Sequence, residues 1–361
     1  MLLILSSSSN LLHSQENWNE KIDSLIEKNM LEHNIKGLSI GIVFNDKIQY
    51  AKGFGKLNEK SNDSITAETP FLSASISKVF VATAIMQLQE QNLLNIDEKL
   101  IRYVPEFRMK DTNYKEITIK QLLNHTSGLK EGSRYTWDRK KNTGSDIKNF
   151  CHSLKNKKLL FEPGEKFSYS NTGYVVLGYI IEKLSNQSFD NYIEENILNP
   201  LGMTNSNFDI NYYDESRFPY YYSAKGKVKK CCIANTSPSG NLISSSTDLS
   251  KWILFNLRLY NKSLPNDSLA LSRQSQTLLW TPTQTFKGSQ TTLGLGWWQY
   301  DSEEFGKSVF HAGHYENYSV SNLVIFPERN YGFVLLCNDE SAKEVVYNQL
   351  SDGISHILEL R

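Results

Sequence analysis

The pattern of apolar and polar positions divides the chain into strand-forming ends and a helix-forming middle. Residues 17–33 place Ile and Leu at helical spacing, which predicts an amphipathic helix. Residues 38–44 and 48–54 flank the turn-forming residues 45–47 and predict a β-hairpin. Residues 75–92 are largely apolar and contain neither Gly nor Pro, which predicts a buried helix.

The rest of the chain continues this division. Further helices are predicted at residues 119–124, 173–184, 189–198, 247–260 and 342–360. Strand patterns return at residues 294–300, 308–311, 319–326 and 332–336, the last two joined by a turn at residues 327–330. Strands at both ends that enclose helices predict an α+β fold, in which one antiparallel sheet is built from both chain ends and a mainly helical lobe is inserted.

Size and charge narrow the class of protein. A chain of 361 residues exceeds the size at which one simple core stops growing, so two lobes or domains are expected. The balance of 39 basic and 39 acidic residues gives no bias toward nucleic acid or anionic membranes, so we expect no nucleic-acid partner. A basic run, Lys225, Lys227, Lys229 and Lys230, lies in a polar loop and is interpreted as solvated surface rather than a phosphate-binding patch.

The first residues bear on location. Residues 1–16 are short, apolar and uncharged before Glu16, which predicts an export signal without its basic n-region or, alternatively, a disordered tail. Export to the periplasm or the extracellular space is therefore expected, with a cytoplasmic location as the alternative. No stretch is long enough for a transmembrane helix.

The cysteines and histidines show no metal-binding or disulfide pattern. Cys151, Cys231, Cys232 and Cys337 form neither a Cys-x-x-Cys pair nor a small disulfide framework. The seven histidines lack a His-Glu-x-x-His spacing, and His311 with His314 alone would be a poor metal site. We therefore predict no metal and no cofactor.

The segment Ser75-Ile76-Ser77-Lys78 opens the predicted buried helix and carries the first candidate chemistry. Residues three apart share a helix face, so the Ser75 hydroxyl and the Lys78 amine would lie within one turn. Unpaired N–H groups and the positive end of the helix dipole at a helix N-terminus favour an oxyanion. A buried lysine can lose its proton and serve as a base. The alternative is a Ser N-cap and a solvated Lys, against which the apolar neighbours argue.

Two further segments follow in order, Tyr169-Ser170-Asn171 and His311-Ala312-Gly313. A neighbouring Lys⁺ would stabilise a Tyr169 phenolate, so Lys78 and Tyr169 would share the general-base role. Asn171 offers a donor and an acceptor that suit a substrate amide. The alternative is that Tyr169 and Asn171 only cap and pack the next helix. Copies of these short motifs occur elsewhere, Ser-x-x-Lys at residues 127–130 and 145–148 and Tyr-x-Asn at residues 315–317.

With these three segments the chain resembles the penicillin-recognising serine hydrolases, in particular the class C β-lactamase and D-alanyl-D-alanine carboxypeptidase branch with its esterase relatives. The resemblance covers most of the chain. It also includes Asn124-His125-Thr126-Ser127-Gly128-Leu129, Pro163-Gly164, the helix through Gly173, Leu177, Gly178 and Ile181, Pro200-Leu201-Gly202-Met203 and Leu293-Gly294-Leu295-Gly296-Trp297.

The resemblance implies a β-lactamase/transpeptidase-like fold. Residues 17–361 would form a single catalytic domain, with an α/β lobe of residues 17–72 and 290–361 and a helical lobe of residues 73–289. The catalytic serine, Ser75, would lie where the two lobes meet.

The third segment departs from the resembling family, in which a basic residue, a hydroxyl residue and Gly follow one another. Here His311 would shape the electric field around the serine and Gly313 would let a ligand lie along the strand edge. Ala312 lacks the hydroxyl that helps to bind a substrate carboxylate, a loss of about 1.5–3 kcal/mol for a charged hydrogen bond. His314 would supply the second oxyanion-hole N–H beside that of Ser75, although residues 314–317 are bulkier and more polar than usual.

These observations predict a serine hydrolase that acts through a Ser75 acyl-enzyme on an amide or ester. Its substrate would be a small molecule or peptide, cell-wall-derived ones included, and carboxypeptidase, esterase, amidase and aminopeptidase-like specificities stay open. The alternative is a non-catalytic penicillin-binding-like sensor or binding protein. A triad built on His125 and Ser127 is disfavoured because that segment is a structural turn in the resembling family and the chain has no Gly-x-Ser-x-Gly elbow.

The loops at residues 130–158 and 211–238 would provide the pocket walls. Their aromatic residues would either line the pocket or pack against the lobe beneath. These residues are Tyr135, Trp137, Tyr212, Tyr213, Tyr220, Tyr221 and Tyr222.

Overall fold

The architecture is built on one eight-stranded antiparallel sheet. The computed structural model describes residues 5–60, 62–131, 146–209, 212–230, 238–263 and 270–360, with side chains from Trp18 onward. The strand order is β2-β1-β12-β11-β10-β9-β8-β7. The strands are β1 (Gly37–Phe44), β2 (Lys47–Gly55), β7 (Gln284–Thr285), β8 (Thr291–Leu293), β9 (Trp298–Ser302), β10 (Gly306–Tyr315), β11 (Ser319–Phe326) and β12 (Tyr331–Cys337).

The sheet joins the two ends of the chain, as predicted. Strand β1 pairs with β12 from Leu38↔Cys337 to Phe44↔Tyr331, and the predicted hairpin β1–β2 is present. One predicted strand starts later than expected, at Trp298. The residues before it form a turn, in which Gly294 N donates to Trp297 O and Gly296 has a positive φ of 79°.

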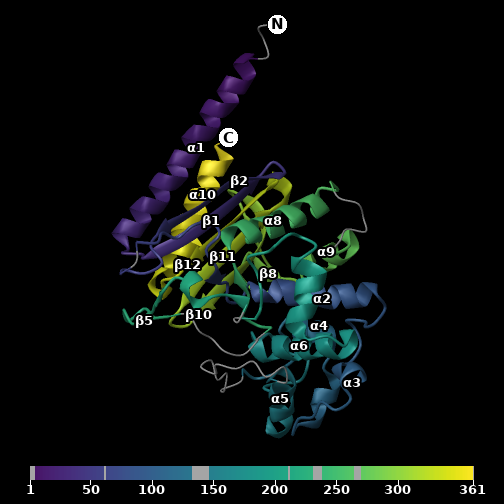
Figure 1. Cartoon of the computed structure of the whole chain (residues 1–361). Helices are drawn as coiled ribbons and strands as arrows, with labels where there is room; N and C mark the ends of the chain where they lie inside the picture. The colour runs from purple at the N-terminus through teal and green to yellow at the C-terminus, as the bar shows by residue number, and fades with distance from the viewer. Residues whose placement is uncertain are drawn as a thin grey trace.

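Helices cover both faces of the sheet (Figure 1). On one face lie α1 (Leu5–Glu32), η8 (Val345–Gln349) and α10 (Leu350–Glu359), and on the other lies α8 (Ser246–Tyr260). Successive residues of β12 alternate between the two cores, because Phe333 and Leu335 pack with the α1 and α10 cluster and Val334 and Leu336 with the α8 cluster.

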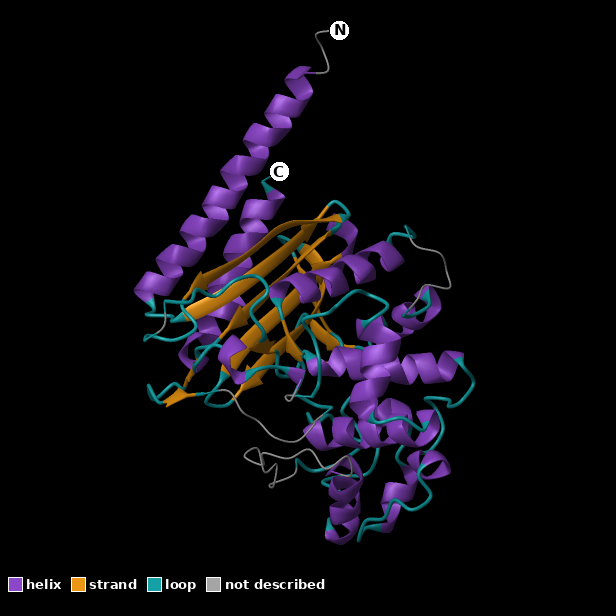
Figure 2. Ribbon diagram, in the orientation of Figure 1, coloured by secondary structure: helices purple, strands orange, loops and turns teal. Residues whose placement is uncertain are grey.

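A second lobe, which is mainly helical, lies beside the sheet (Figure 2). It contains α2 (Ser77–Glu90), α3 (Leu100–Tyr103), α4 (Ile119–Leu123), α5 (Asp146–Ser153), α6 (Asn171–Ser185), α7 (Phe189–Ile193) and α9 (Arg273–Trp280). The predicted helical lobe of residues 73–289 also includes α8, yet this helix packs on β1 and β12. Helix α2 is the centre of the lobe, because every residue from Ser77 to Leu88 is buried.

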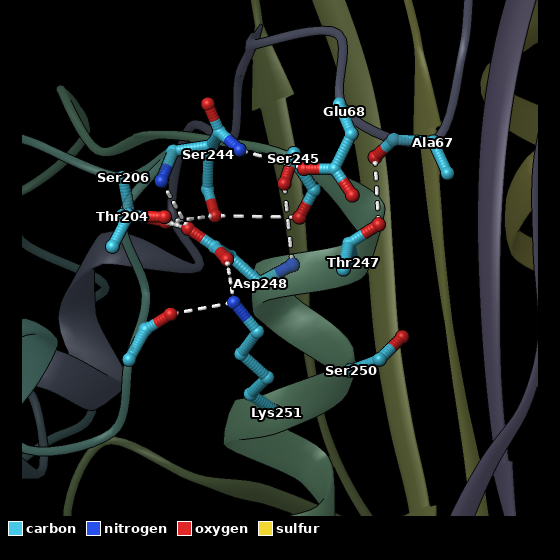
Figure 3. Close-up of polar contacts among 12 residues, drawn as sticks. Ala67, Glu68, Thr204, Ser206, Ser244, Ser245, Thr247, Asp248, Ser250 and Lys251 are labelled. Carbon is cyan, nitrogen blue, oxygen red and sulfur yellow. Dashed lines mark hydrogen bonds and ion pairs between the residues drawn. The ribbon is translucent and has the colours of Figure 1, made fainter.

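A polar network holds residues 244–248, which lie beside the strand that leads into Ser75 (Figure 3). Ser245 caps α8 by accepting from Asp248 N at 3.2 Å, and the buried Asp248 carboxylate accepts from Ser206 Oγ at 2.9 Å and Lys251 Nζ at 2.8 Å. Ser206 Oγ lies 2.7 Å from Ser244 Oγ. Ser244 belongs to β6 (Ile243–Ser244), which pairs with β3 (Phe71–Leu72) just ahead of Ser75.

Several sequence-based expectations concern termini, membranes and metals. Helix α1 starts at Leu5, within the segment for which a signal or tail is predicted, and residues 1–4 lie outside the described residues. Among the described helices none is both long and apolar enough to cross a membrane. The described residues also contain no group of three His, Cys, Asp or Glu side chains placed to hold a metal. Cys151 and Cys337 are free and buried, while Cys231 and Cys232 lie outside the described residues.

Candidate active site

Ser75 lies in a tight turn between β3 and α2. The helix was expected to start at Ser75 but starts at Ser77, so Ser75 precedes its first turn. Ala74 has a positive φ of 48°, a conformation that L residues adopt only when the surroundings hold it. The Ser77 hydroxyl holds it here, because it donates to Ala74 O at 2.6 Å and accepts from Leu242 N at 2.9 Å.

Strand β11 also holds the backbone just ahead of Ser75 by hydrogen bonds. Ser321 Oγ donates to Ser73 O at 2.8 Å, and Ser319 Oγ donates to Leu72 O at 2.8 Å. A Cβ placed on Gly313 would lie 2.2 Å from Ser321 Oγ and 2.5 Å from Ser73 O. Only glycine therefore fits at position 313, and this fit brings β10 directly against the nucleophile turn.

Lys78 is the centre of the buried polar cluster. Its Nζ lies 3.1 Å from Ser75 Oγ, 2.6 Å from Asn171 Oδ1 and 2.6 Å from Ser239 O. Burial lowers the pKa of Lys78 to about 7, against an opposing effect of the Glu131 carboxylate. A neutral amine has two N–H donors and one lone pair. Because the Asn171 and Ser239 oxygens can only accept, they take both donors and the lone pair faces the Ser75 hydroxyl.

Tyr169 also contacts Ser75. Its hydroxyl is hydrogen-bonded to Ser75, and Lys78 Nζ lies 4.9 Å from the centre of its ring. Burial raises the pKa of Tyr169, and its hydrogen bond with Ser75 offsets this only in part. The expected lowering of the Tyr169 pKa is therefore not found. The pKa shifts favour Lys78 rather than Tyr169 as the group that loses its proton.

His125 supports Tyr169 and does not form a triad. Its ring packs 4.3 Å from the Tyr169 ring, and its Nδ1 accepts from Ser170 N at 3.1 Å. Within the described residues its Nε2 has no hydrogen-bond partner, while Ser127 Oγ accepts from Leu129 N. Neither ring nitrogen is paired with Ser127, which fits the predicted structural role of this segment.

The strand segment His311-Ala312-Gly313 differs in two respects from its expected roles. His311 is buried, its Nδ1 lies 2.8 Å from Ala312 O, and burial together with the nearby Lys78 lowers the pKa of His311 to about 3. A neutral His311 cannot supply the positive charge expected of the basic residue. Ala312 lines a separate cavity of about 450 Å³ between the sheet and the C-terminal helices, together with Phe310 and Tyr347.

Gly313 and His314 are held by residues that follow β12 in the sequence. Tyr347 donates its hydroxyl hydrogen to Gly313 O at 2.8 Å, and His314 Nε2 lies 3.2 Å from Glu340 Oε1. Glu340 Oε2 also accepts from Ala224 N at 2.9 Å. Glu340 therefore ties the end of β10 to the loop before β5 (Val228–Lys229), a connection with no local signal in the sequence.

An open cavity of about 440 Å³ lies over Ser75. Its lining includes Asn171 and His314, so three of the predicted site residues meet there. The complete lining is Ala74, Ser75, Asn171, Lys229, Ser239, Gly240, His314, Tyr315, Glu316, Asn317 and Tyr318. The second Tyr-x-Asn copy at residues 315–317 thus lies at the cavity wall, at the end of β10.

Sequence reasoning missed Glu131 and misjudged Lys229. The Glu131 carboxylate accepts from Asn171 N at 2.8 Å and from Asn171 Nδ2 at 3.2 Å, so the amide that was expected to bind substrate is already paired. Lys229 was interpreted as solvated surface, but it is half-buried and lines the cavity.

The predicted aromatic walls mostly pack instead of lining this cavity. Tyr213, Tyr221 and Tyr222 are buried, and Tyr212 is 51% exposed. None of these four lines the Ser75 cavity, while Tyr135 and Trp137 lie outside the described residues.

Comparison with known proteins agrees with this geometry. A family model described as Beta-lactamase matches residues 22–351. The protein Flp of Staphylococcus aureus (strain NCTC 8325) is 31% identical over 326 residues, which cover 88% of this chain and 63% of Flp. The chain thus spans less than two thirds of the length of that relative. Penicillin-binding protein 4* of Bacillus subtilis (strain 168) is 28% identical over 367 residues, which cover 95% of this chain and 77% of that protein.

Solved structures show the same fold. An octameric penicillin-binding protein homologue from Pyrococcus abyssi superposes with a TM-score of 0.76 at 27% identity, covering 94% of this chain and 76% of that one. A class C β-lactamase superposes with a TM-score of 0.78 at 22% identity, covering 96% of each chain.

Proposed function

The chain belongs to the Beta-lactamase family, and from that premise we propose that it is a serine hydrolase that works through a Ser75 acyl-enzyme on an amide or ester. The observation that carries this proposal is the placement of Ser75 between a buried lysine and a neutral tyrosine. Lys78 Nζ lies 3.1 Å from Ser75 Oγ, and the Tyr169 hydroxyl is bonded to the same oxygen.

In the acylation step Ser75 Oγ attacks the substrate carbonyl carbon while its proton moves to the lone pair of Lys78 Nζ. The lysine then carries the charge, and its ammonium can hold all three of its hydrogen-bond partners. Tyr169, bonded to Ser75 Oγ, passes a proton to the leaving nitrogen or oxygen and regains one from Lys78. Water attacks the acyl-enzyme in the second half by the same transfers in reverse.

The developing oxyanion would accept from backbone N–H groups. Within the described residues the N–H of Ser75 donates no hydrogen bond, so it is free to take this role. His314 lines the same cavity at the end of β10, and its N–H is proposed as the second donor. Gly313 lets the strand approach the nucleophile turn closely enough for both donors to reach one oxygen.

The substrate classes of the proposal are β-lactams, D-amino-acid peptides and small esters. The name of penicillin-binding protein 4* supports the first class, and the buried Lys78–Tyr169 pair would serve any acyl group. Action on the cell-wall side of the membrane is part of the same proposal.

The test is intact-mass spectrometry after incubation with benzylpenicillin, and separately with an aryl fluorophosphonate. We expect an adduct on the wild type and on Ser127→Ala, which serves as the matched serine control, and none on Ser75→Ala. Hydrolysis of p-nitrophenyl acetate should follow the same pattern. Labelling of Ser75→Ala would show that another residue is the nucleophile. Absence of both adducts and of ester hydrolysis in the wild type would favour the non-catalytic binding protein.

A further inference from the structure

The cavity over Ser75 contains a cation that the proposed chemistry does not use. Lys229 contributes the one Lys or Arg side chain among the described lining residues. His311 is neutral near pH 7, because burial lowers its pKa to about 3. Lys78 does not line this cavity and is only partly protonated near pH 7, because burial lowers its pKa to about 7. His314 is engaged with Glu340. A substrate in this cavity therefore meets the Lys229 ammonium as its main positive charge.

Lys229 is held in place and is not a freely moving surface side chain. Its Nζ lies 4.7 Å from the centre of the Tyr318 ring, and such a cation–π contact orients an ammonium. The Tyr318 ring is packed edge-on against Tyr221 at 5.7 Å and against Tyr315 at 5.4 Å. Within the described part of the chain, Lys229 has this ring contact and no carboxylate partner.

The backbone of Lys229 is joined to the nucleophile segment through one residue. In β4 (Tyr221–Tyr222), Tyr221 pairs directly with Lys229, and its hydroxyl oxygen accepts from Leu72 N at 3.0 Å. Leu72 ends the strand that leads into Ser75. Tyr221 is fully buried. The distance between the ammonium and the nucleophile is therefore set by packed structure, as a specificity contact requires.

We propose that Lys229 binds an anionic group, a carboxylate in the first instance, on the acyl part of the substrate, the part that stays attached to Ser75. This inference rests on the proposed function. It identifies the substrate class as acyl esters or amides whose acyl chain carries a negative charge.

Glu316 lines the same cavity and carries a charge opposite to that of Lys229. Its side chain is exposed at the end of β10, so it weakens the attraction for an anion without cancelling the oriented ammonium. Removal of Lys229 and removal of Glu316 should consequently change the selectivity for anionic acyl groups in opposite directions.

The experiment uses the mono-p-nitrophenyl esters of succinate, glutarate and adipate, each with a free carboxylate at the other end. Each is compared with the mixed diester in which that carboxylate is a methyl ester. The leaving group is constant, and each pair differs in one negative charge on the acyl chain. The measured quantity is the ratio of kcat/KM for the acid to kcat/KM for its methyl ester. We expect Lys229→Ala to lower this ratio roughly 10- to 100-fold for the best chain length, the range of a charge-assisted hydrogen bond.

Three variants act as controls for that ratio. Lys229→Arg keeps the charge and should retain most of the selectivity. Lys227→Ala removes an exposed lysine near the same strand and should leave the ratio unchanged. Glu316→Gln should raise it. Equal ratios for Lys229→Ala and Lys227→Ala would overturn the proposal.

The two proposals fail in different ways. Turnover of the methyl diesters that disappears in Ser75→Ala supports the hydrolase whatever Lys229 does. If no ester is turned over, calorimetry of Ser75→Ala with monomethyl glutarate still tests the lysine. Binding that is lost in Ser75→Ala/Lys229→Ala but kept in Ser75→Ala/Lys227→Ala supports the anion site, and equal binding by both double variants refutes it.

Discussion

Replacing Lys78 by methionine should change the stability of the fold by an amount that depends on pH. Lys78 is fully buried, and burial lowers its pKa from 10.5 to about 7. Between these two values the unfolded chain holds a proton that the folded protein has released. Stability therefore rises with pH across this window, and protonation of the unfolded lysine opposes folding at pH 7 and below. Methionine has a similar length and no proton to exchange.

The magnitude follows from the size of the shift. With one pKa unit worth about 1.36 kcal/mol, the lysine opposes folding by roughly 4 kcal/mol at pH 7 and by roughly 2 kcal/mol at pH 9. The loss of its hydrogen bonds to Asn171 and Ser239 adds an opposite contribution of about 1–3 kcal/mol for each acceptor left unpaired. The absolute difference between the proteins is thus small, and its change with pH is the informative quantity.

The assay is urea denaturation of the wild type and Lys78→Met at pH 5, 7 and 9. We expect the stability of the wild type relative to the variant to change by less than about 0.5 kcal/mol from pH 5 to 7 and to rise by about 2 kcal/mol from pH 7 to 9. Lys155→Met, at an exposed lysine, should give a difference independent of pH. A flat difference for Lys78→Met over the whole range would refute the reasoning, because the buried amine would then keep its proton.

Four further outcomes are expected. The kcat/KM of the wild type should rise with pH to a plateau with a midpoint near 7, the pKa of Lys78, and a profile without that limb would remove Lys78 as the base. Tyr169→Phe, which loses the hydroxyl bonded to Ser75, should lower kcat about 10²- to 10⁴-fold, the range of general acid–base catalysis, with KM nearly unchanged. Gly313→Ala, whose Cβ would lie 2.2 Å from a serine oxygen, should abolish turnover and lower the melting temperature, and full activity would contradict the close packing. Ser127→Ala should keep kcat within about twofold of wild type by a p-nitrophenyl acetate assay, because its hydroxyl serves a backbone N–H.

Local patterns predict that Ser75 and Lys78 lie close together because this contact depends on a short spacing. Ser75 and Lys78 are three residues apart at the start of an apolar helix, and the structure places their polar atoms 3.1 Å apart. The strand pattern of residues 319–326 coincides with β11, in which every residue is buried.

The ionisation states could not be predicted in the same way. Whether Lys78 or Tyr169 gives up its proton depends on how completely each is removed from water, and this is set by segments distant in sequence. His311 likewise becomes neutral through burial and through proximity to Lys78. A motif identifies which side chains meet, while their charges follow from the packing around them.

The positions of Lys229 and Glu131 at the site could not be predicted from sequence patterns for a related reason. Lys229 belongs to a basic run, and such a run is usually solvated. Its pairing with Tyr221 and its contact with the Tyr318 ring turn one member of the run toward the cavity. Glu131 reaches Asn171 across 40 positions of sequence, a contact that no local spacing indicates.

The pairing of β1 with β12 has a consequence for how the protein is made. Leu38 finds its partner Cys337 only after the long segment between them has left the ribosome. Gly313 and the β11 serines that hold the nucleophile turn also emerge late. A nascent chain can therefore present Ser75 long before the surroundings that activate it exist, so it cannot acylate itself on substrate during synthesis. Contacts between such distant segments also slow folding.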